Sequence, residues 1–232
     1  CGNVYEEEIA RQSDIVILEV SPNIPYMLGD NYLDLDEVDY IIEADYFLPT
    51  IPDVSPSEKD EIIGKYIAER IHDGDCIQIG IGGIPNAVCE QLAGKKDLGV
   101  HTEMMTTGIM KLIRLGVING SKKQINKGKA VCAFALGNQE MYEFMHNNPD
   151  ILVSRGSWVN DPYVIAQNKN QVSINTSIEV DLTGQCCSES VGNMQISGTG
   201  GQSDTAVGAQ RSENGRSFIA LYTAAAVKNR ET

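Results

Sequence analysis

The chain has 232 residues, and its 32 Asp and Glu outnumber 18 Lys and Arg, which gives a formal net charge of -14 at pH 7. We therefore expect no nucleic acid partner, because phosphate binding requires a clustered positive surface. With 42% hydrophobic residues, the chain is globular and long enough to bury a core. No segment reaches the length of a membrane span, so we expect no membrane association.

The six cysteines lack the CxxC spacing of zinc and redox sites, and most of them lie in apolar runs. We expect reduced, buried thiols in a cytoplasmic protein. No His or Cys joins the acidic runs at metal-ligand spacing, so no metal is predicted. The chain begins at Cys1 rather than Met, in what reads as the middle of an α/β pattern, and we expect a fragment of a longer protein.

The first fifty residues predict one helix and two strands. The helical pattern covers Tyr5–Arg11, and Asp14–Val20 is an apolar run typical of strands buried in parallel sheets. A strand at Tyr40–Glu43 lies within an acidic run, which indicates a solvated face rather than a metal site. The Pro-rich segment 51–56 cannot continue regular pairing, so we place a domain boundary there.

A compact strand–turn–helix–strand unit follows the boundary. Ser57 caps a helix that continues to Ile71, with acidic residues in its first turn. The strand Cys76–Ile79 leads into the glycine turn 80–84, whose glycines permit positive φ and a close approach of the backbone to a ligand. A helix opened by Pro85 then leads to a second strand, Leu98–His101.

Glu103 lies just past the end of that second strand. Parallel strands end at the same edge of a sheet, and ligands bind at this edge in open α/β folds, so we expect Glu103 beside the glycine turn. A partly desolvated carboxylate there can act as a base, an acid or a nucleophile. His101 shares its strand face and either orients a neighbour or is a core histidine, and the core role is favoured.

The remaining chain continues to alternate strands and helices. Asp161 caps a short helix that Pro162 opens. The alternating run Gln171–Leu182 predicts an antiparallel or edge strand. A second glycine cluster, Ser197–Asp204, is expected to end a loop before the last strand, Phe218–Ala225. The pattern as a whole predicts an α/β fold with a mixed sheet.

The glycine turn alone does not specify a chemistry. It lacks the G-K-[ST] of a P-loop and departs from the GxGxxG dinucleotide pattern, and most Gly-rich turns serve geometry only. The second glycine cluster and the nearby carboxylate favour a shared site, because backbone N–H groups of such turns bind anions or a developing oxyanion. No GxSxG motif supports a serine triad, and Cys76 and Cys89 lie in structural runs.

Several motifs in order resemble one family. GIGGIPNAV, HTEM, VNDPYVIAQN, SIEVDLTGQ and SGTGGQSD together are similar to the acetyl-CoA hydrolase/transferase family, and within it to the 4-hydroxybutyrate and butyrate-type CoA-transferases. The resemblance implies a family I CoA-transferase with two CoA-transferase-like (NagB/RpiA-like) open mixed-sheet α/β domains. It also implies coenzyme A as a substrate, a short-chain carboxylate as the second substrate, and a homodimer.

The resemblance assigns roles to particular residues. It makes Glu103 the nucleophile that attacks the acyl-CoA thioester and forms a glutamyl-CoA intermediate, with Asn160 as an auxiliary active-site residue. The implied CoA contacts are Gly80, Ile81, Gly82, Gly83 and Ile84 of the glycine turn, together with Ile178 and the oxyanion-stabilising Gly201.

The resemblance also implies how the chain is divided. Residues 1–50 correspond to the end of a first CoA-transferase domain, 51–56 to the linker, and 57–232 to a second domain that carries the catalytic glutamate and is truncated at its C-terminus. Much of the first domain would then be absent, and this fragment would fold without being active.

Alternatives to CoA transfer differ in chemistry. An acyl-CoA hydrolase would use the same glutamate if water reached the covalent intermediate. Glu179 could be the nucleophile in place of Glu103, although its strand position also suits a structural role. A non-catalytic CoA- or nucleotide-binding module and a structural interaction protein are the remaining classes, and the latter gives the two glycine loops no shared purpose.

Overall fold

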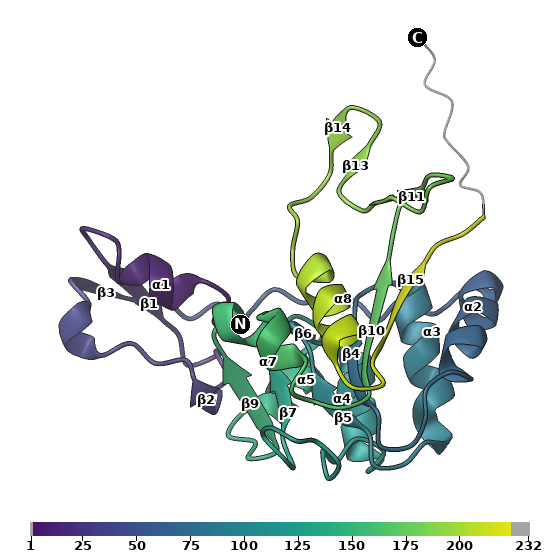
Figure 1. The fold of residues 1–232 in the computed structure, drawn as a ribbon. Helices are drawn as coiled ribbons and strands as arrows, with labels where there is room; N and C mark the ends of the chain where they lie inside the picture. Colours follow the sequence, from purple (N-terminus) through teal and green to yellow (C-terminus); the bar gives the residue numbers. More distant parts are fainter. Residues whose placement is uncertain (1, 224–232) are drawn as a thin grey trace.

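The computed structural model describes residues 2–223 and centres on a seven-stranded sheet (Figure 1). The strand order is β15-β10-β4-β5-β7-β9-β2, and each of its neighbouring pairs is parallel. The strands are β2 (Gly29–Asp30), β4 (Cys76–Ile79), β5 (Gly99–His101), β7 (Ala130–Cys132), β9 (Ile151–Ser154), β10 (Gln171–Thr176) and β15 (Arg216–Ala220).

The α/β class is confirmed, but the large sheet is parallel where we predicted a mixed one. The prediction of an antiparallel or edge strand for Gln171–Leu182 was wrong for β10, which lies between β15 and β4 inside the sheet. The alternation of polar and apolar residues suggested one solvated face. In the structure both faces are buried, because a helix covers the polar side chains of Ser173 and Asn175.

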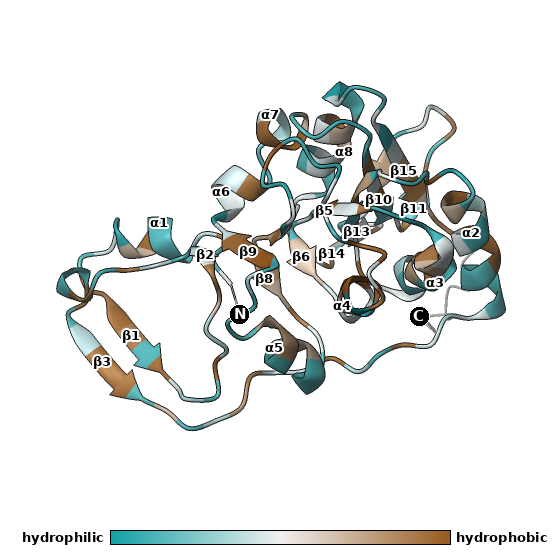
Figure 2. Cartoon of the chain, turned by 90° about the horizontal axis from the view of Figure 1, so that it is seen from below, coloured by the Kyte–Doolittle hydropathy of each residue, from teal (hydrophilic) through white to brown (hydrophobic). Residues whose placement is uncertain are grey.

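Helices cover both faces of the sheet (Figure 2). One layer holds α2 (Glu58–Ala68), α3 (Gly83–Gln91), α4 (Thr107–Arg114) and α5 (Gln139–Met145), and the other holds α6 (Gly156–Val159), α7 (Pro162–Ile165) and α8 (Gln202–Arg211). The predicted cap of α2 is confirmed, since Ser57 and Asp60 exchange side-chain and backbone hydrogen bonds. The predicted Asp161 cap is also confirmed: the carboxylate accepts from Tyr163 N at 2.7 Å.

The core lies between the sheet and the first helix layer. Fully buried side chains from the central strands, such as Ile77 and Ile174, pack with residues of α3 and α4, such as Val88 and Ile109. The strands β4 and β10 thus direct apolar side chains toward this helix layer. The βαβ unit of β4, α3 and β5 forms as predicted, with Cys76 paired to Gly99 and Ile77 to Val100.

The N-terminal segment contains α1 (Glu6–Ala10), β1 (Ile17–Val20), the 3-10 turn η1 (Leu35–Glu37) and β3 (Tyr40–Glu43). The prediction of a buried strand at Asp14–Val20 was wrong in its burial, because β1 pairs only with β3 and its apolar residues face solvent among the described elements. Figure 2 shows both strands apart from the main body, with hydrophobic residues over part of their length and hydrophilic ones over the rest. The chain also joins the large sheet, since β2 pairs with β9. The proposed domain boundary at 51–56 stays a prediction.

Short pairs of strands complete the fold. β6 (Met104–Met105) pairs in parallel with β8 (Phe134–Ala135), directly after Glu103. Between β10 and α8 the chain forms two hairpins that project from the body in Figure 1. Their strands are β11 (Glu179–Val180), β12 (Cys186–Cys187), β13 (Ser190–Val191) and β14 (Met194–Gln195). Elsewhere, the 3-10 turn η2 (Leu92–Gly94) follows the end of α3.

The segment after the second glycine cluster differs from the prediction. A ten-residue helix, α8, stands between Gly201 and the last strand, where we predicted no helix and expected the cluster to end a loop. The helix escaped prediction because it packs through small residues rather than an apolar stripe: a Cβ on Gly208 would lie 2.6 Å from Ile165. The last strand, predicted at Phe218–Ala225, is confirmed only up to Ala220, because β15 begins earlier, at Arg216, and residues 221–223 are not part of a strand. Residues 224 and 225 lie outside the described residues. No helix within residues 2–223 is long and apolar enough to cross a membrane.

Candidate active site

The candidate residues converge on the carboxyl edge of the parallel sheet. Gly80 follows β4, Glu103 follows β5, and Ile178 follows β10. Asn160 ends the short helix α6, which begins two residues after β9. Since these four strands run in the same direction, their following segments share one edge, where α/β folds bind ligands.

Glu103 is the centre of a three-residue cluster. Its Oε1 accepts a hydrogen bond from Asn160 Nδ2 at 3.1 Å, and its Oε2 accepts one from the Gly201 backbone N–H, also at 3.1 Å. The backbone carbonyl of Glu103 accepts from the N–H groups of Ala133 and Phe134. Main chain and carboxylate are therefore both held, while the side chain remains partly accessible.

Asn160 is buried, with 6% of its surface exposed. The amide nitrogen must face Glu103, because a carboxylate only accepts hydrogen bonds. The amide oxygen then has no partner among the described residues. Asn160 is thus fixed by its contact with Glu103 and by the backbone of α6.

His101 holds that backbone in place. Its Nε2 lies 2.8 Å from the carbonyl oxygen of Val159, the residue before Asn160. Burial lowers the pKa of His101 to about 4, so the ring is neutral at pH 7 and Nε2–H is the donor. The ring also contacts Trp158 at a centroid distance of 5.6 Å. His101 therefore has both of the roles that the sequence left open. It is a core residue, and it orients the segment that carries Asn160.

Gly201 lies directly against the ends of the Glu103 and Asn160 side chains. It precedes α8 with φ of -95°, which any residue can adopt, so its conformation does not require glycine. A Cβ there would lie 2.7 Å from Glu103 Oε2 and 2.8 Å from Asn160 Nδ2. A side chain at this position would displace the ends of the Glu103 and Asn160 side chains, so glycine lets the backbone N–H approach the carboxylate without moving either of them.

The glycine turn presents backbone at the same edge. Gly82 has φ of +119°, a conformation that favours glycine, and α3 begins at Gly83. A Cβ on Gly83 would lie 2.4 Å from the Asp60 carboxylate, so α2 packs directly against this turn. Ile84 is buried and Ile81 is exposed. The turn thus exposes backbone and one apolar side chain to solvent.

The predicted residues are only partly joined by contacts. Glu103, Asn160 and Gly201 form one hydrogen-bonded cluster, whereas no hydrogen bond between described residues links the glycine turn or Ile178 to it. Ile178 is 40% exposed, and its N–H donates to the Cys187 carbonyl. Glu179, the alternative nucleophile, is exposed on β11. Among residues 2–223, none donates a hydrogen bond to its carboxylate, in contrast to the two donors at Glu103.

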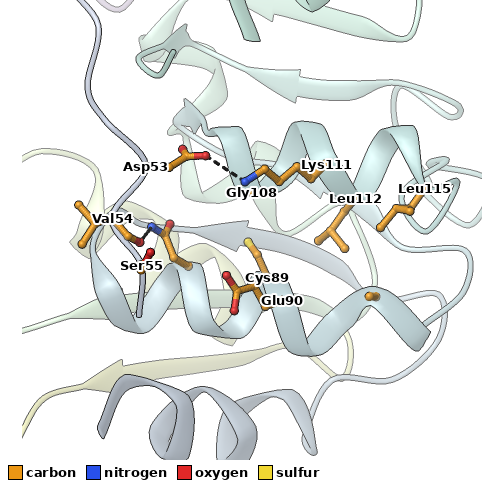
Figure 3. A pocket seen from close by; sticks show the side chains of 11 residues that line it. Asp53, Val54, Ser55, Cys89, Glu90, Gly108, Lys111, Leu112 and Leu115 are labelled. Carbon is orange, nitrogen blue, oxygen red and sulfur yellow. Dashed lines mark hydrogen bonds and ion pairs between the residues drawn. The ribbon is translucent and has the colours of Figure 1, made fainter. Parts of the chain in front are cut away.

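A separate pocket of about 360 Å³ lies between the Pro-rich segment, α3 and α4 (Figure 3). Lys111 Nζ bonds Asp53 at 2.9 Å across its rim, and Asn86 donates to the Val54 carbonyl. Apolar side chains such as Leu112 and Leu115 line its wall. None of the predicted site residues is among the described residues that line it.

Three cysteines are buried as expected, whereas the expectation was wrong for Cys186, which is exposed, and for Cys187, which is half-buried. Burial raises the pKa of Cys76, Cys89 and Cys132 to about 12, so these thiols stay protonated at neutral pH. Residues 2–223 contain no cluster of three His, Cys, Asp or Glu side chains that could hold a metal.

Comparison with known proteins identifies the class. The structure matches a 4-hydroxybutyrate CoA-transferase from Porphyromonas gingivalis with a TM-score of 0.85 at 38% identity, over 95% of this chain and 53% of that chain. A succinyl-CoA:cyclohexane-1-carboxylate CoA transferase of Geobacter metallireducens is 47% identical, over 97% of this chain and 51% of the relative. A 4-hydroxybutyrate coenzyme A transferase of Clostridium kluyveri is 43% identical, over 97% of this chain and 52% of the relative. The fold and the sequence thus place the chain among proteins related to CoA-transferases.

The family model described as the acetyl-CoA hydrolase/transferase C-terminal domain matches residues 137–231. The chain belongs to the acetyl-CoA hydrolase/transferase family, as the motif resemblance predicted. It spans about half the length of the curated relatives it matches.

Proposed function

We propose that this chain carries the catalytic glutamate of an acyl-CoA:carboxylate CoA-transferase. The observation that supports it most is the hydrogen bonding of Glu103, whose two carboxylate oxygens each face one donor. The family membership supports coenzyme A as the carried group. Together they favour covalent transfer through Glu103 over simple binding.

The first half-reaction moves CoA to the protein. One Glu103 oxygen attacks the acyl-CoA carbonyl carbon, and the CoA thiolate leaves, which gives a mixed anhydride. The thiolate then attacks Cδ of Glu103 and releases the acyl group as a free carboxylate. The product is a glutamyl-CoA thioester, so the energy of the thioester bond is retained.

The second half-reaction repeats these steps in reverse. The acceptor carboxylate attacks Cδ of the glutamyl thioester and expels the CoA thiolate. The thiolate attacks the acceptor acyl carbon of the new anhydride, which forms the new acyl-CoA and restores the Glu103 carboxylate. No net proton transfer is needed, because each nucleophile and leaving group is an anion.

The cluster around Glu103 suits these steps. When a nucleophile attacks Cδ, negative charge develops on the remaining glutamyl oxygen, where the donor already bound to it can stabilise that charge. Removal of one such donor costs about 10²–10³ in kcat in comparable sites. Gly201 N–H is a fixed backbone donor, and Asn160 Nδ2 belongs to a buried side chain whose movement is restricted.

We propose that the glycine turn, Gly80–Ile84, and Ile178 contact CoA. The turn supplies backbone groups at the edge where Glu103 lies, and the exposed Ile81 and Ile178 offer apolar surface. Backbone N–H groups are a suitable means of holding phosphates in an acidic protein. Short-chain carboxylates remain the proposed acceptors.

The test mixes acyl-CoA with a second carboxylate in the presence of the intact protein and follows both new thioester and free thiol. Transfer predicts new thioester without loss of total thioester. Release of free thiol without a new thioester would instead indicate a hydrolase. The Glu103→Gln variant should lose exchange, and full exchange by that variant would refute the enzyme proposal.

A further inference from the structure

A buried polar cluster lies beneath the candidate site. Its four members are Gln78 of β4, Ser173 and Asn175 of β10, and Thr205 of α8, and each is at most 8% exposed. Gln78 and Ser173 are direct partners across the two strands, and Asn175 follows two residues later on the same face. The opposite face of these strands is apolar.

The four side chains satisfy one another. The Asn175 amide nitrogen lies 3.0 Å from the oxygen of Ser173 and 3.3 Å from the side-chain oxygens of Gln78 and Thr205, and its two N–H groups donate to this set of three acceptors. In return Gln78 Nε2 donates to Asn175 Oδ1, and the Ser173 hydroxyl lies within 3.2 Å of both Gln78 and Thr205. Buried polar groups cost free energy unless they are paired, so a fully paired cluster selects one arrangement of its elements.

The cluster connects directly to the groups around Glu103. Thr205 N–H donates to the Gly201 carbonyl at 2.9 Å, and the Thr205 hydroxyl donates to the Gln202 carbonyl. Gly201 N–H is the donor to Glu103. Thr205 therefore fixes the first turn of α8, and with it the N–H that faces the carboxylate.

The same cluster reaches the glycine turn. Gln78 lies two residues before Gly80 on β4, and Gly80 N–H donates to the Ile174 carbonyl, next to Asn175. A Cβ on Gly80 would lie 3.5 Å from Asn175 Oδ1. The cluster thus lies next to both glycine segments, and the backbone of β10 holds Gly80 directly beside it.

We propose that the cluster of Gln78, Ser173, Asn175 and Thr205 is a positioning device that fixes the Gly201 N–H on Glu103 relative to the glycine turn. None of these side chains needs to touch the substrate. They act through Gly201 and Gly80. Apolar side chains of the same shape would also hold α8 against the sheet, but they would not fix the position of its first turn. The proposal rests on the function proposed above.

The test compares two hydroxyls on the same helix. Thr205→Val removes the hydroxyl near Gly201 with little change in shape, and Thr205→Ser keeps it. Ser212→Ala is the matched control, because the Ser212 hydroxyl is also buried but lies at the other end of α8, where it donates to the Asn168 carbonyl. Both Thr205→Val and Ser212→Ala should lower the melting temperature.

Only Thr205→Val should lower kcat, by about tenfold, because misplacement near 1 Å costs up to about 10² in rate. Thr205→Ser should have a kcat close to that of the parent, and Ser212→Ala should keep kcat within about twofold of the parent. Hydrogen exchange of the Gly201 amide, which needs no activity, should accelerate in Thr205→Val and not in Ser212→Ala.

Equal kinetics and equal Gly201 exchange in Thr205→Val and Ser212→Ala would refute the positioning role. Absence of transfer activity in the unmodified intact protein would refute the proposed function instead. In that case the Gly201 exchange rates still decide whether the cluster fixes α8.

Discussion

The close approach of Gly201 to Glu103 yields a sharp prediction. In a Gly201→Ala variant the new Cβ would lie 2.7 Å from Glu103 Oε2, whereas ordinary contacts begin near 3.4 Å. The carboxylate or the first turn of α8 must therefore move by about 0.7 Å. Such a shift approaches the 1 Å misplacement that costs about 10² in rate, and it lengthens the hydrogen bond from Gly201 N–H. We predict that kcat for CoA transfer falls about 10²-fold.

The stability of the variant separates this effect from unfolding. The φ of Gly201 is accessible to alanine, so the cost is steric, and overpacking of this kind destabilises by about 1–3 kcal/mol. Thermal unfolding should therefore still show a folded protein at assay temperature. Steady-state kinetics of acyl-CoA and a carboxylate acceptor then measure kcat on folded enzyme.

Gly198→Ala is the matched control in the same loop. A Cβ at Gly198 would have no neighbour within 4 Å in the described part of the chain. This variant should keep kcat within about twofold of the parent. A Gly201→Ala protein with kcat equally close to that of the parent would show that the close approach to Glu103 has no catalytic role.

Three further predictions concern other parts of the site and core. Asn160→Ala removes the donor to Glu103 Oε1 and should lower kcat by about 10²-fold with a smaller effect on the KM for acyl-CoA, and an unchanged kcat would remove Asn160 from the mechanism. Burial lowers the pKa of His101 to about 4 from 6.5, so protonation favours the unfolded state, and stability is lost as the pH falls below 6.5. Urea titrations should show about 2 kcal/mol of this loss between pH 7.5 and 5.0, and a His101→Gln variant that shows the same loss would contradict the assignment. In the native protein a thiol reagent should modify Cys187 and its neighbour Cys186 well before Cys76, Cys89 and Cys132, since hydrogen bonds from Ser190 lower the pKa of Cys187 while burial raises the pKa of the other three. Peptide mapping of early labelling checks this order, and early labelling of the three buried thiols would contradict it.

The local elements near the site could be predicted because their signals are local. The apolar run before the glycine turn predicts β4, and the Ser57 and Asp161 caps mark the starts of α2 and α7. Since β4 and β5 are parallel, the position of Glu103 at the carboxyl edge followed from strand ends alone.

The contacts of Glu103 could not be predicted from local patterns. Asn160 and Gly201 are 57 and 98 residues away in sequence, and only the family resemblance linked them to the site. Likewise, alternation in β10 cannot distinguish a solvated polar face from one buried under a helix. Ser173 and Asn175 belong to the second kind because Gln78 and Thr205 satisfy their hydrogen bonds.

For the N-terminal strands, the sequence predicted the secondary structure but not the burial. The apolar run at Asp14–Val20 correctly predicted β1, but its burial depends on a covering surface that the sequence of the run cannot reveal. Within residues 2–223, β3 is its strand partner and solvent reaches most of its side chains.

A covalent glutamyl-CoA thioester on Glu103 can be sought directly. The intact protein is incubated with acyl-CoA and treated with borohydride or hydroxylamine, and the modified peptide is mapped by mass spectrometry. We predict modification at Glu103, dependent on acyl-CoA and absent from the Glu103→Gln variant. Modification at Glu179, or full CoA exchange without any modified glutamate, would contradict the account.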